Sequence, residues 1–145
     1  MTYKENLDNL IEEIDAVFPD KTIKVSLACL NDLFIAEPYD ILVYRWIKEL
    51  LTNVYKHSDG TRAWIMLSAE RKQLKLTVCD NGTQVLIAEI LGSNKKTKQK
   101  GLSSIKEQVE KLSGTFILSN HIPQGFRVEI TMIMNGGNSY QYFIS

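Results

Sequence analysis

Apolar residues recur at helical spacing in two parts of the N-terminal half of the chain. In the range 3–18 they return every three or four positions, and Pro19 stops the pattern. The range 37–57 carries a wider apolar face, with Pro38 well placed for a first helical turn. That face consists of Leu42, Val43, Trp46, Ile47, Leu50, Leu51 and Val54. We therefore expect two amphipathic helices, each with one buried side.

Other stretches alternate apolar and polar residues, which is the period of a half-buried strand. They cover residues 22–29, 63–69, 74–79, 115–119 and 126–134. Polar residues at 70–73 predict a hairpin turn between the second and third stretches, and Pro123-Gln124-Gly125 predicts a turn between the last two. The pattern favours an α/β fold of the α+β kind, a two-layer sandwich in which a mixed sheet packs against about three helices.

The third expected helix begins at Gly101 and ends at Gly114. Its apolar face consists of Leu102, Ile105, Val109 and Leu112. The preceding residues 92–100 are polar and rich in lysine, and they predict a mobile surface loop. Residues 135–145 have little to bury and predict a flexible tail.

Composition limits the classes of protein that remain. The chain has 145 residues and is 44% hydrophobic, which suits a single domain with one core. Its 17 basic residues balance 17 acidic residues, so no overall field favours nucleic acid or an anionic membrane. Apolar stretches fall short of bilayer length and Met1 does not open a signal peptide, so we expect a soluble, cytoplasmic domain. Cys29 and Cys79 lack partners at metal or disulfide spacing and predict small buried residues.

A polar stripe follows the expected helix at 37–57, because four of its residues lie three or four positions apart. They are Arg45, Glu49, Asn53 and Lys56. Spacing alone favours a solvated helix surface. Asparagine, however, is a poor residue for the middle of a helix, whereas its carbonyl oxygen is a good Mg²⁺ ligand. Glu49, one turn earlier, is placed to act as a base.

Two further segments have both a structural and a functional interpretation. Asn81-Gly82 is a strong turn signal, but Asp80 before it can also accept a hydrogen bond from an exocyclic amine such as that of adenine. Gly82 would let a flat base approach the backbone. The lysines before Gly101 suit an ordinary solvated loop, or a group that assists the helix amides after Gly101 in binding an anion. These lysines are Lys95, Lys96, Lys98 and Lys100.

The order of these features resembles the GHKL ATPase superfamily, whose members share the Bergerat ATP-binding fold. Residues 49–58, Glu-Leu-Leu-Thr-Asn-Val-Tyr-Lys-His-Ser, are similar to the N box of sensor histidine kinases with short ATP lids, such as nitrate and membrane-fluidity sensors. Residues 80–82 resemble the G1 box, and residues 100–115 resemble the G2 box with the helix after it. Gly125 stands where the family's last glycine turn falls.

The resemblance implies the catalytic ATP-binding domain of a two-component sensor histidine kinase, which donates the γ-phosphoryl group of ATP to a histidine. It assigns Glu49 to polarising the phosphoacceptor histidine, Asn53 to Mg²⁺ and Lys56 to the phosphates. It assigns Asp80 to the adenine amine, with Gly82 beside the base. The other implied nucleotide-binding residues are His57, for which packing or capping is an equal alternative, Lys100, Gly101 and Leu102, the last two through their amides at the phosphates.

Some positions depart from the family pattern. Gln84 and Gln99 stand where the G1 and G2 boxes have glycine, and Phe126 replaces a threonine after the last glycine turn. The two histidines, His57 and His121, do not lie in a sequence like that of a phosphoacceptor helix. Transfer to histidine therefore requires a second domain.

We expect residues 1–20 to be a linker helix from a missing phosphoacceptor domain, residues 21–134 to be the catalytic domain and residues 135–145 to be a tail. The implied partners are the phosphoacceptor and dimerisation domain and a downstream response regulator, in a membrane-bound sensor kinase that dimerises; this fragment alone can be a monomer. Three alternatives stay open: a stand-alone relative, an anti-sigma-type serine kinase, and a degenerate module without catalysis that serves dimerisation or partner binding.

Overall fold

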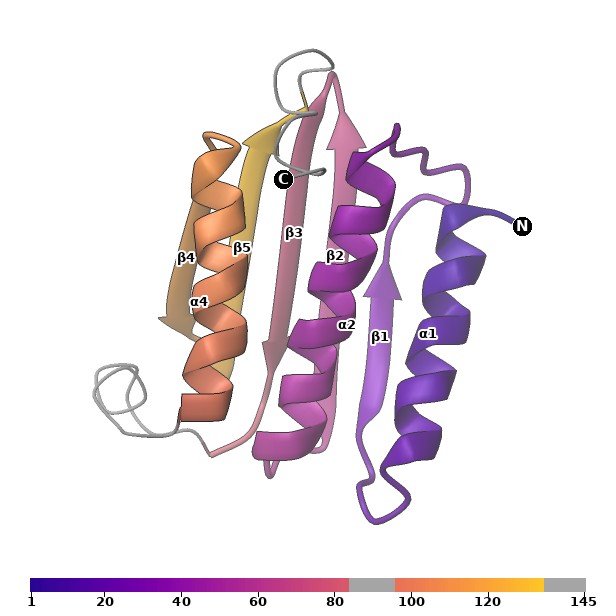
Figure 1. The fold of residues 1–145 in the computed structure, drawn as a ribbon. Coiled ribbons are helices and arrows are strands. Elements are labelled where there is room, and N and C mark those ends of the chain that lie inside the picture. The colour runs from indigo at the N-terminus through magenta and orange to yellow at the C-terminus, as the bar shows by residue number, and fades with distance from the viewer. Residues whose placement is uncertain (84–95, 135–145) are drawn as a thin grey trace.

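The computed structural model describes residues 1–83 and 96–134, with the backbone alone for 96–100. Helices and strands follow one another along the chain as Figure 1 shows. Their bounds are α1 (Tyr3–Val17), β1 (Lys24–Ala28), α2 (Tyr39–His57), β2 (Arg62–Glu70), β3 (Gln73–Asp80), α4 (Lys96–Lys111), β4 (Thr115–Asn120) and β5 (Phe126–Ile133). The predicted α/β sandwich is confirmed, with one helix boundary that differs substantially.

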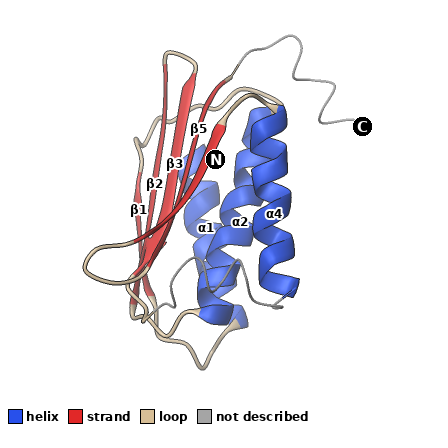
Figure 2. Ribbon diagram, turned by 90° about the vertical axis from the view of Figure 1, so that its left-hand side faces the viewer, coloured by secondary structure: helices blue, strands red, loops and turns tan. Residues whose placement is uncertain are grey.

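The sheet is mixed and has the order β1-β2-β3-β5-β4. Strand β1 runs parallel to β2, and the other neighbouring pairs are antiparallel. Along β3 and β5, buried and more exposed residues alternate, which is the pattern of a sheet with one covered face. Figure 2 shows α1, α2 and α4 together on that one face. The molecule is therefore a two-layer sandwich.

Helix α1 belongs to the same hydrophobic core as the rest of the sandwich. Leu7, Leu10 and Ile14 share one of its faces and are buried. Near its C-terminal end, the Tyr55 hydroxyl of α2 donates a hydrogen bond to Asp15 Oδ1 at 2.9 Å. Residues 1–20 thus pack as part of the sandwich, and their role as a linker from a phosphoacceptor domain stays a prediction.

The turn between β2 and β3 uses two residues with left-handed backbone. Arg71 and Lys72 have φ values of 51° and 65°. Two consecutive positive φ values are typical of a type I′ hairpin turn, whose twist matches that of the flanking strands. The hairpin turn predicted at 70–73 is confirmed.

The start of α4 corrects the prediction made for the lysine-rich segment. Helix α4 begins at Lys96, so residues 96–100 are helical and Gly101 does not start the helix. Lysine and glutamine form helices well, so their intrinsic propensity favours a helix without any apolar residues. Residues 92–95 of the expected loop and the expected tail at 135–145 lie outside the described residues.

Candidate functional site

The ends of several helices and strands lie together at one end of the sandwich, the lower end in Figure 1. Helix α2 ends there at His57, β3 ends at Asp80, β5 begins at Phe126, and α4 also begins at this end. A cavity lies between these elements, lined by Leu50, Asn53, Val54, Ser58, Val78, Asp80, Leu102, Phe126 and Val128. Its volume of about 20 Å³ has room for about one water molecule.

Asn53 contributes an unsatisfied amide to the wall of this cavity. Its Nδ2 atom is buried and has no hydrogen-bond partner, the single such side-chain atom in the described part of the chain. Buried amides nearly always have partners, because an unpaired one costs about 1–3 kcal/mol. The Asn53 side chain is therefore a group available to a ligand.

Asp80 is the buried acidic residue of the cavity, with 2% of its surface exposed. Its Oδ1 atom accepts hydrogen bonds from Ser58 Oγ at 3.0 Å and from the Gly82 amide at 2.8 Å. A Cβ atom at position 82 would overlap the Ser58 hydroxyl. The missing side chain of Gly82 therefore allows Ser58 to approach and orient the Asp80 carboxylate.

The turn between β4 and β5 packs against the backbone of Asp80 and Asn81. Gln124 Nε2 donates to the Asn81 carbonyl oxygen at 2.9 Å. Gly125 has a φ of 123°, and a Cβ atom there would overlap the Asp80 carbonyl oxygen. Both the positive φ and this close approach favour glycine. The predicted glycine turn is confirmed, and it packs against the backbone of the site.

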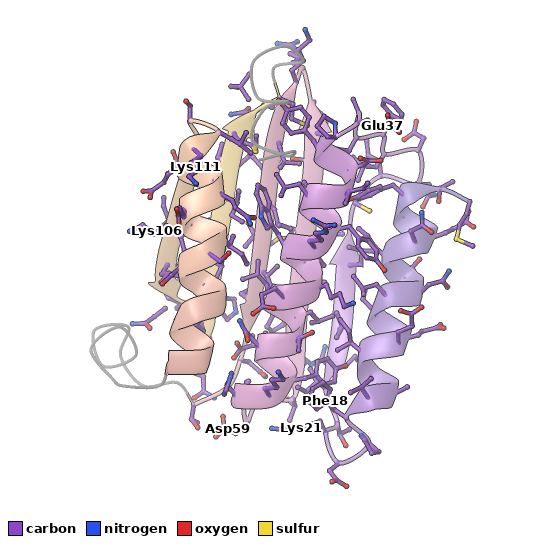
Figure 3. The ribbon with its side chains drawn as sticks, in the orientation of Figure 1. Phe18, Lys21, Glu37, Asp59, Lys106 and Lys111 are labelled. Carbon is purple, nitrogen blue, oxygen red and sulfur yellow. The ribbon has the colours of Figure 1, made fainter. Side chains whose placement is uncertain are left out.

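Asp59, just beyond α2, holds the residue that follows Gly82. Its carboxylate accepts one hydrogen bond from the Thr83 hydroxyl and another from the Thr83 amide at 2.6 Å. These bonds, the hydroxyl first, hold the pKa of Asp59 below its usual value. Lys21 Nζ donates to the Ser58 carbonyl oxygen at 2.9 Å, and Figure 3 shows Lys21 and Asp59 at this same end of the molecule.

A larger groove of about 400 Å³ lies between α2 and α4, lined by Leu42, Arg45, Trp46, Glu49, Gly101, Ser104, Ile105 and Gln108. Glu49 lies directly against Gly101, where a Cβ atom would overlap Glu49 Oε1. Trp46 Nε1 joins the two helices by donating to Gln108 Oε1 at 2.8 Å. Glu49 in the groove and Asn53 in the cavity thus belong to spaces shared with α4, so the polar stripe of α2 is more than a solvated surface.

The structure brings together most of the predicted site residues. Asn53, Asp80 and Leu102 line the cavity, and Glu49 and Gly101 line the groove beside it. The expectation that Gly101 and Leu102 present free amides to an anion is wrong, because both lie inside α4, where amides bond to carbonyls of the preceding turn. Any other role of Gly101 in nucleotide binding stays a prediction.

Other predicted residues lie apart from these two spaces. Lys56 and His57 are exposed and line neither the cavity nor the groove. The side chain of Lys100 lies outside the described residues. Ser58 and Asp59 were not predicted to have a role, although Ser58 falls inside the segment that resembles the N box. Their contacts join segments far apart in the chain, and no local pattern marks them.

Comparison with known proteins places the chain in a family. The family described as histidine kinase-, DNA gyrase B-, and HSP90-like ATPase matches residues 39–135. These residues carry α2, the cavity, the groove and all the strands except β1. The chain belongs to this ATPase family, which confirms the resemblance to the GHKL superfamily.

The curated relatives are sensor histidine kinases. Sensor histidine kinase YdfH of Bacillus subtilis (strain 168) is 30% identical over 132 residues, which make up 88% of this chain and 32% of that protein. Sensor histidine kinase YxjM of the same organism is 30% identical over 99 residues, or 68% of this chain and 22% of that protein. The chain thus spans no more than about a third of the length of these relatives.

Solved structures share the fold. The ATP binding domain of PrrB from Mycobacterium tuberculosis has a TM-score of 0.68 at 19% identity, covering 94% of this chain and 96% of that chain. The Erythrobacter litoralis EL346 blue-light activated histidine kinase has a TM-score of 0.72 at 18% identity, covering 95% and 47%. The sandwich is the fold of histidine kinase ATP-binding domains, as predicted.

Proposed function

We propose that this chain is the ATP-binding catalytic domain of a sensor histidine kinase, which donates the γ-phosphoryl group of ATP to a histidine on a separate domain. The observation that carries the proposal is that one cavity is lined by both Asn53, whose Nδ2 atom is unsatisfied, and Asp80, whose carboxylate Ser58 orients. Membership in an ATPase family supports ATP as the nucleotide.

Asp80 suits recognition of the adenine base. A carboxylate accepts hydrogen bonds and donates none, so it favours a base with an exocyclic amine. The apolar cavity walls formed by Leu50, Leu102 and Val128 suit the flat faces of a base. A buried acceptor that loses its partner also disfavours bases without that amine. Asp80 is therefore the residue we assign to the choice of base.

The residues present fit Mg²⁺ carried by the nucleotide. No group of three acidic, histidine or cysteine side chains occurs in the described ranges to form a cage for the ion. Mg²⁺ bound with phosphates needs only one or two protein ligands, however, and a side-chain amide oxygen is suitable. Asn53, whose buried Nδ2 atom has no partner within the structure's described residues, would hold the ion through its amide oxygen. When bound, Mg²⁺ neutralises charge on the phosphates.

Glu49 is the candidate for the base that acts on the incoming histidine. It lies on α2 one turn before Asn53, and it lines the open groove rather than the closed cavity. This position leaves it accessible to a group from another domain while Asn53 serves the nucleotide. The remaining contribution of the chain is to position the reacting groups.

The partners and the setting follow from the relatives. Sensor kinases imply a phosphoacceptor and dimerisation domain and a response regulator, and we propose both as partners in a dimeric, membrane-attached protein whose catalytic domain is cytoplasmic. We likewise propose that residues 1–20 link the two domains and that the chain belongs to the short-lid subgroup that includes nitrate and membrane-fluidity sensor kinases. The described helices include none that is long and apolar enough to cross a membrane.

A second candidate function is a degenerate module that keeps the fold for dimerisation or partner binding. The observation that favours it is the small cavity, about 20 Å³ against the roughly 300–1,000 Å³ of ordinary ligand pockets. Phe126 contributes to its wall where the family has threonine. Nucleotide binding therefore requires the cavity to widen, and a binding measurement separates the two candidates.

The test is isothermal titration of this chain with ADP and with a non-hydrolysable ATP analogue, each with and without Mg²⁺. We expect saturable binding that Asp80→Asn weakens at least tenfold, because the amide of asparagine opposes the adenine amine. Asn53→Ala should abolish the dependence on Mg²⁺. Asn6→Ala, which also removes a helical asparagine but lies on the exposed side of α1, is the matched control and should bind like the parent.

Absence of binding at millimolar nucleotide would contradict the catalytic proposal and favour the degenerate module. Binding that is equal for ADP with and without Mg²⁺, and unchanged in Asn53→Ala, would remove Asn53 from the proposed metal role while leaving nucleotide binding intact.

A further inference from the structure

The geometry points to Ser58 as a positioning residue for base recognition, whose hydroxyl holds the Asp80 carboxylate in the orientation that selects adenine. This inference rests on the proposed function and goes further, since it adds a residue and a measurable specificity. It rests on the hydrogen bonds that the Ser58 hydroxyl and backbone form with neighbouring residues.

The Ser58 hydroxyl hydrogen points toward Asp80. A serine hydroxyl has one hydrogen to donate and two lone pairs that accept. The Gly60 amide donates to Ser58 Oγ at 2.9 Å, and Ser58 Oγ lies 3.0 Å from Asp80 Oδ1. Because an amide occupies one lone pair, the hydroxyl hydrogen is left for Asp80, which can only accept when ionised. The Ser58 hydroxyl is therefore directed at the carboxylate.

The backbone of Ser58, which carries this hydroxyl, is itself held by hydrogen bonds. The Ser58 amide donates to the Val54 carbonyl oxygen at 2.9 Å, and the Ser58 carbonyl oxygen accepts from Lys21 Nζ at 2.9 Å. With 2% of its surface exposed, Ser58 is also shielded from water that could replace its bonds. The hydroxyl thus stands on a fixed base at the end of α2.

Without the Ser58 hydroxyl, Asp80 would lose one of the hydrogen-bond donors that orient its carboxylate. Two donors, the Ser58 hydroxyl and the Gly82 amide, converge on the same oxygen of Asp80. The second side-chain torsion of aspartate has broad minima, so loss of one of these two donors to Oδ1 loosens the carboxylate plane. Removal of the hydroxyl should therefore blur the orientation that distinguishes an amine from a carbonyl on the base. A serine that served only folding would change stability and leave base selection alone.

The experiment compares ADP with IDP, which carries a carbonyl in place of the adenine amine, by titration of the parent and of Ser58→Ala. We expect the parent to prefer ADP, and Ser58→Ala to lower both ADP affinity and the ADP to IDP preference on the order of tenfold, the size of one hydrogen bond to a charged group. Ser58→Thr keeps the hydroxyl, and the extended backbone of Ser58, with φ −87° and ψ 141°, accepts a β-branched residue. It should retain the preference.

Two controls separate positioning from folding. Tyr55→Phe removes a different hydroxyl that donates to a carboxylate, that of Asp15 at 2.9 Å, and Tyr55 does not line the cavity. It should lower the melting temperature and keep the ADP to IDP preference. If Ser58→Ala does not fold, Ser58→Cys, similar in size with a weak donor, should show an intermediate preference. In the nucleotide-free protein, Ser58→Ala should also shift the NMR resonance of the Gly82 amide, which shares the same Asp80 oxygen.

The possible results are distinct. An unchanged ADP to IDP preference in Ser58→Ala, with a lower melting temperature, would overturn the positioning role and leave the proposed function standing. A parent that binds neither nucleotide, or binds both equally, would overturn the inference together with the assignment of Asp80 to adenine. Loss of preference in Tyr55→Phe as well would also overturn it, because the effect would then follow stability.

Discussion

Helix α2 meets its two neighbouring helices in different ways. Toward α1 it shares a core in which Leu7, Leu10 and Ile14 are buried. Toward α4 it leaves a groove of about 400 Å³ and, farther along, a cavity that contains an unpaired amide. The first contact is the kind that stabilises a fold, whereas the second keeps polar groups and space that reduce stability. Such local costs are expected at functional sites.

The comparison also places the candidate site on one helix face. The helices α1 and α4 lie on either side of α2 in Figure 1. Glu49 and Asn53, which sequence analysis assigned to chemistry, belong to the α4 side, and Tyr55, which bonds to Asp15 of α1, belongs to the other. Changes on the α1 side should therefore affect the free energy of unfolding, and changes on the α4 side should affect nucleotide chemistry.

The largest expected effect is that of Leu10→Ala on the α1 side. Truncation of this buried side chain should lower the free energy of unfolding by about 2–5 kcal/mol, through lost burial and the cavity left behind. Urea unfolding measures the change, and ADP affinity of the folded protein should stay within about twofold of the parent. Ile11→Ala, at a partly exposed neighbouring position, is the control and should cost less. Weaker ADP binding in Leu10→Ala would show that the two sides of α2 are not separate.

A smaller effect is expected for Gln108→Ala on the α4 side. The change removes the acceptor of the Trp46 indole and leaves a buried N–H unpaired, so unfolding should become easier by about 1–3 kcal/mol. Chemical denaturation measures it. Gln108→Glu keeps an acceptor and should stay close to the parent. An equal loss in both variants would attribute the effect to the exposed surface of α4 and not to the bond across the groove.

Gly101→Ala should separate stability from function. Alanine favours a helix over glycine by about 1 kcal/mol, which offsets much of the cost of displacing the flexible end of Glu49. The free energy of unfolding should therefore change by less than about 1 kcal/mol. Phosphoryl transfer from radiolabelled ATP to a phosphoacceptor domain supplied in trans should nevertheless fall about tenfold to a hundredfold, because Glu49 is misplaced. Undiminished transfer would remove Glu49 from the proposed role.

The smallest effect concerns the exposed Asp59 and its dependence on pH. Because hydrogen bonds from Thr83 hold its pKa below the ordinary value of 3.8, ionised Asp59 stabilises the folded state. This contribution is complete at neutral pH, begins to decline as the pH approaches 3.8, and is lost as the pH falls through the lowered pKa. Melting temperatures of the parent and Asp59→Asn should therefore differ slightly at neutral pH and converge in acid. A difference that grows toward low pH would contradict this assignment.

The elements of the fold could be predicted because their signals are local. Apolar residues at helical spacing marked α1 and α2, and strict alternation marked the strands. The start of α4 was missed because the lysine-rich residues 96–100 include no apolar residue from which helical spacing could be recognised. The left-handed Arg71 and Lys72 were also beyond prediction, since neither residue type favours that conformation.

The candidate site could be predicted only where sequence held an anomaly. Asn53 was noticed because it is a poor residue inside a helix, and Asp80 because a turn signal follows it. Ser58 and Asp59 look like ordinary residues after a helix, and their partners in the site, Asp80 and Thr83, lie 22 and 24 residues away. Contacts of that kind depend on how β3 docks beside α2, which no local pattern contains.

The hydrogen bond between Trp46 and Gln108 makes Trp46 an intrinsic fluorescence reporter for the groove between α2 and α4. Indole emission responds to whether the N–H is bonded and to how wet its surroundings are, and Trp46 reaches across from α2 to α4. The other tryptophan, Trp64, lies on β2 with its ring centroid 5.1 Å from that of His121. The substitution Trp64→Phe would remove its contribution to the tryptophan fluorescence. In that background, a change in the wavelength or intensity of the Trp46 emission on addition of a nucleotide would report whether α4 moves relative to α2.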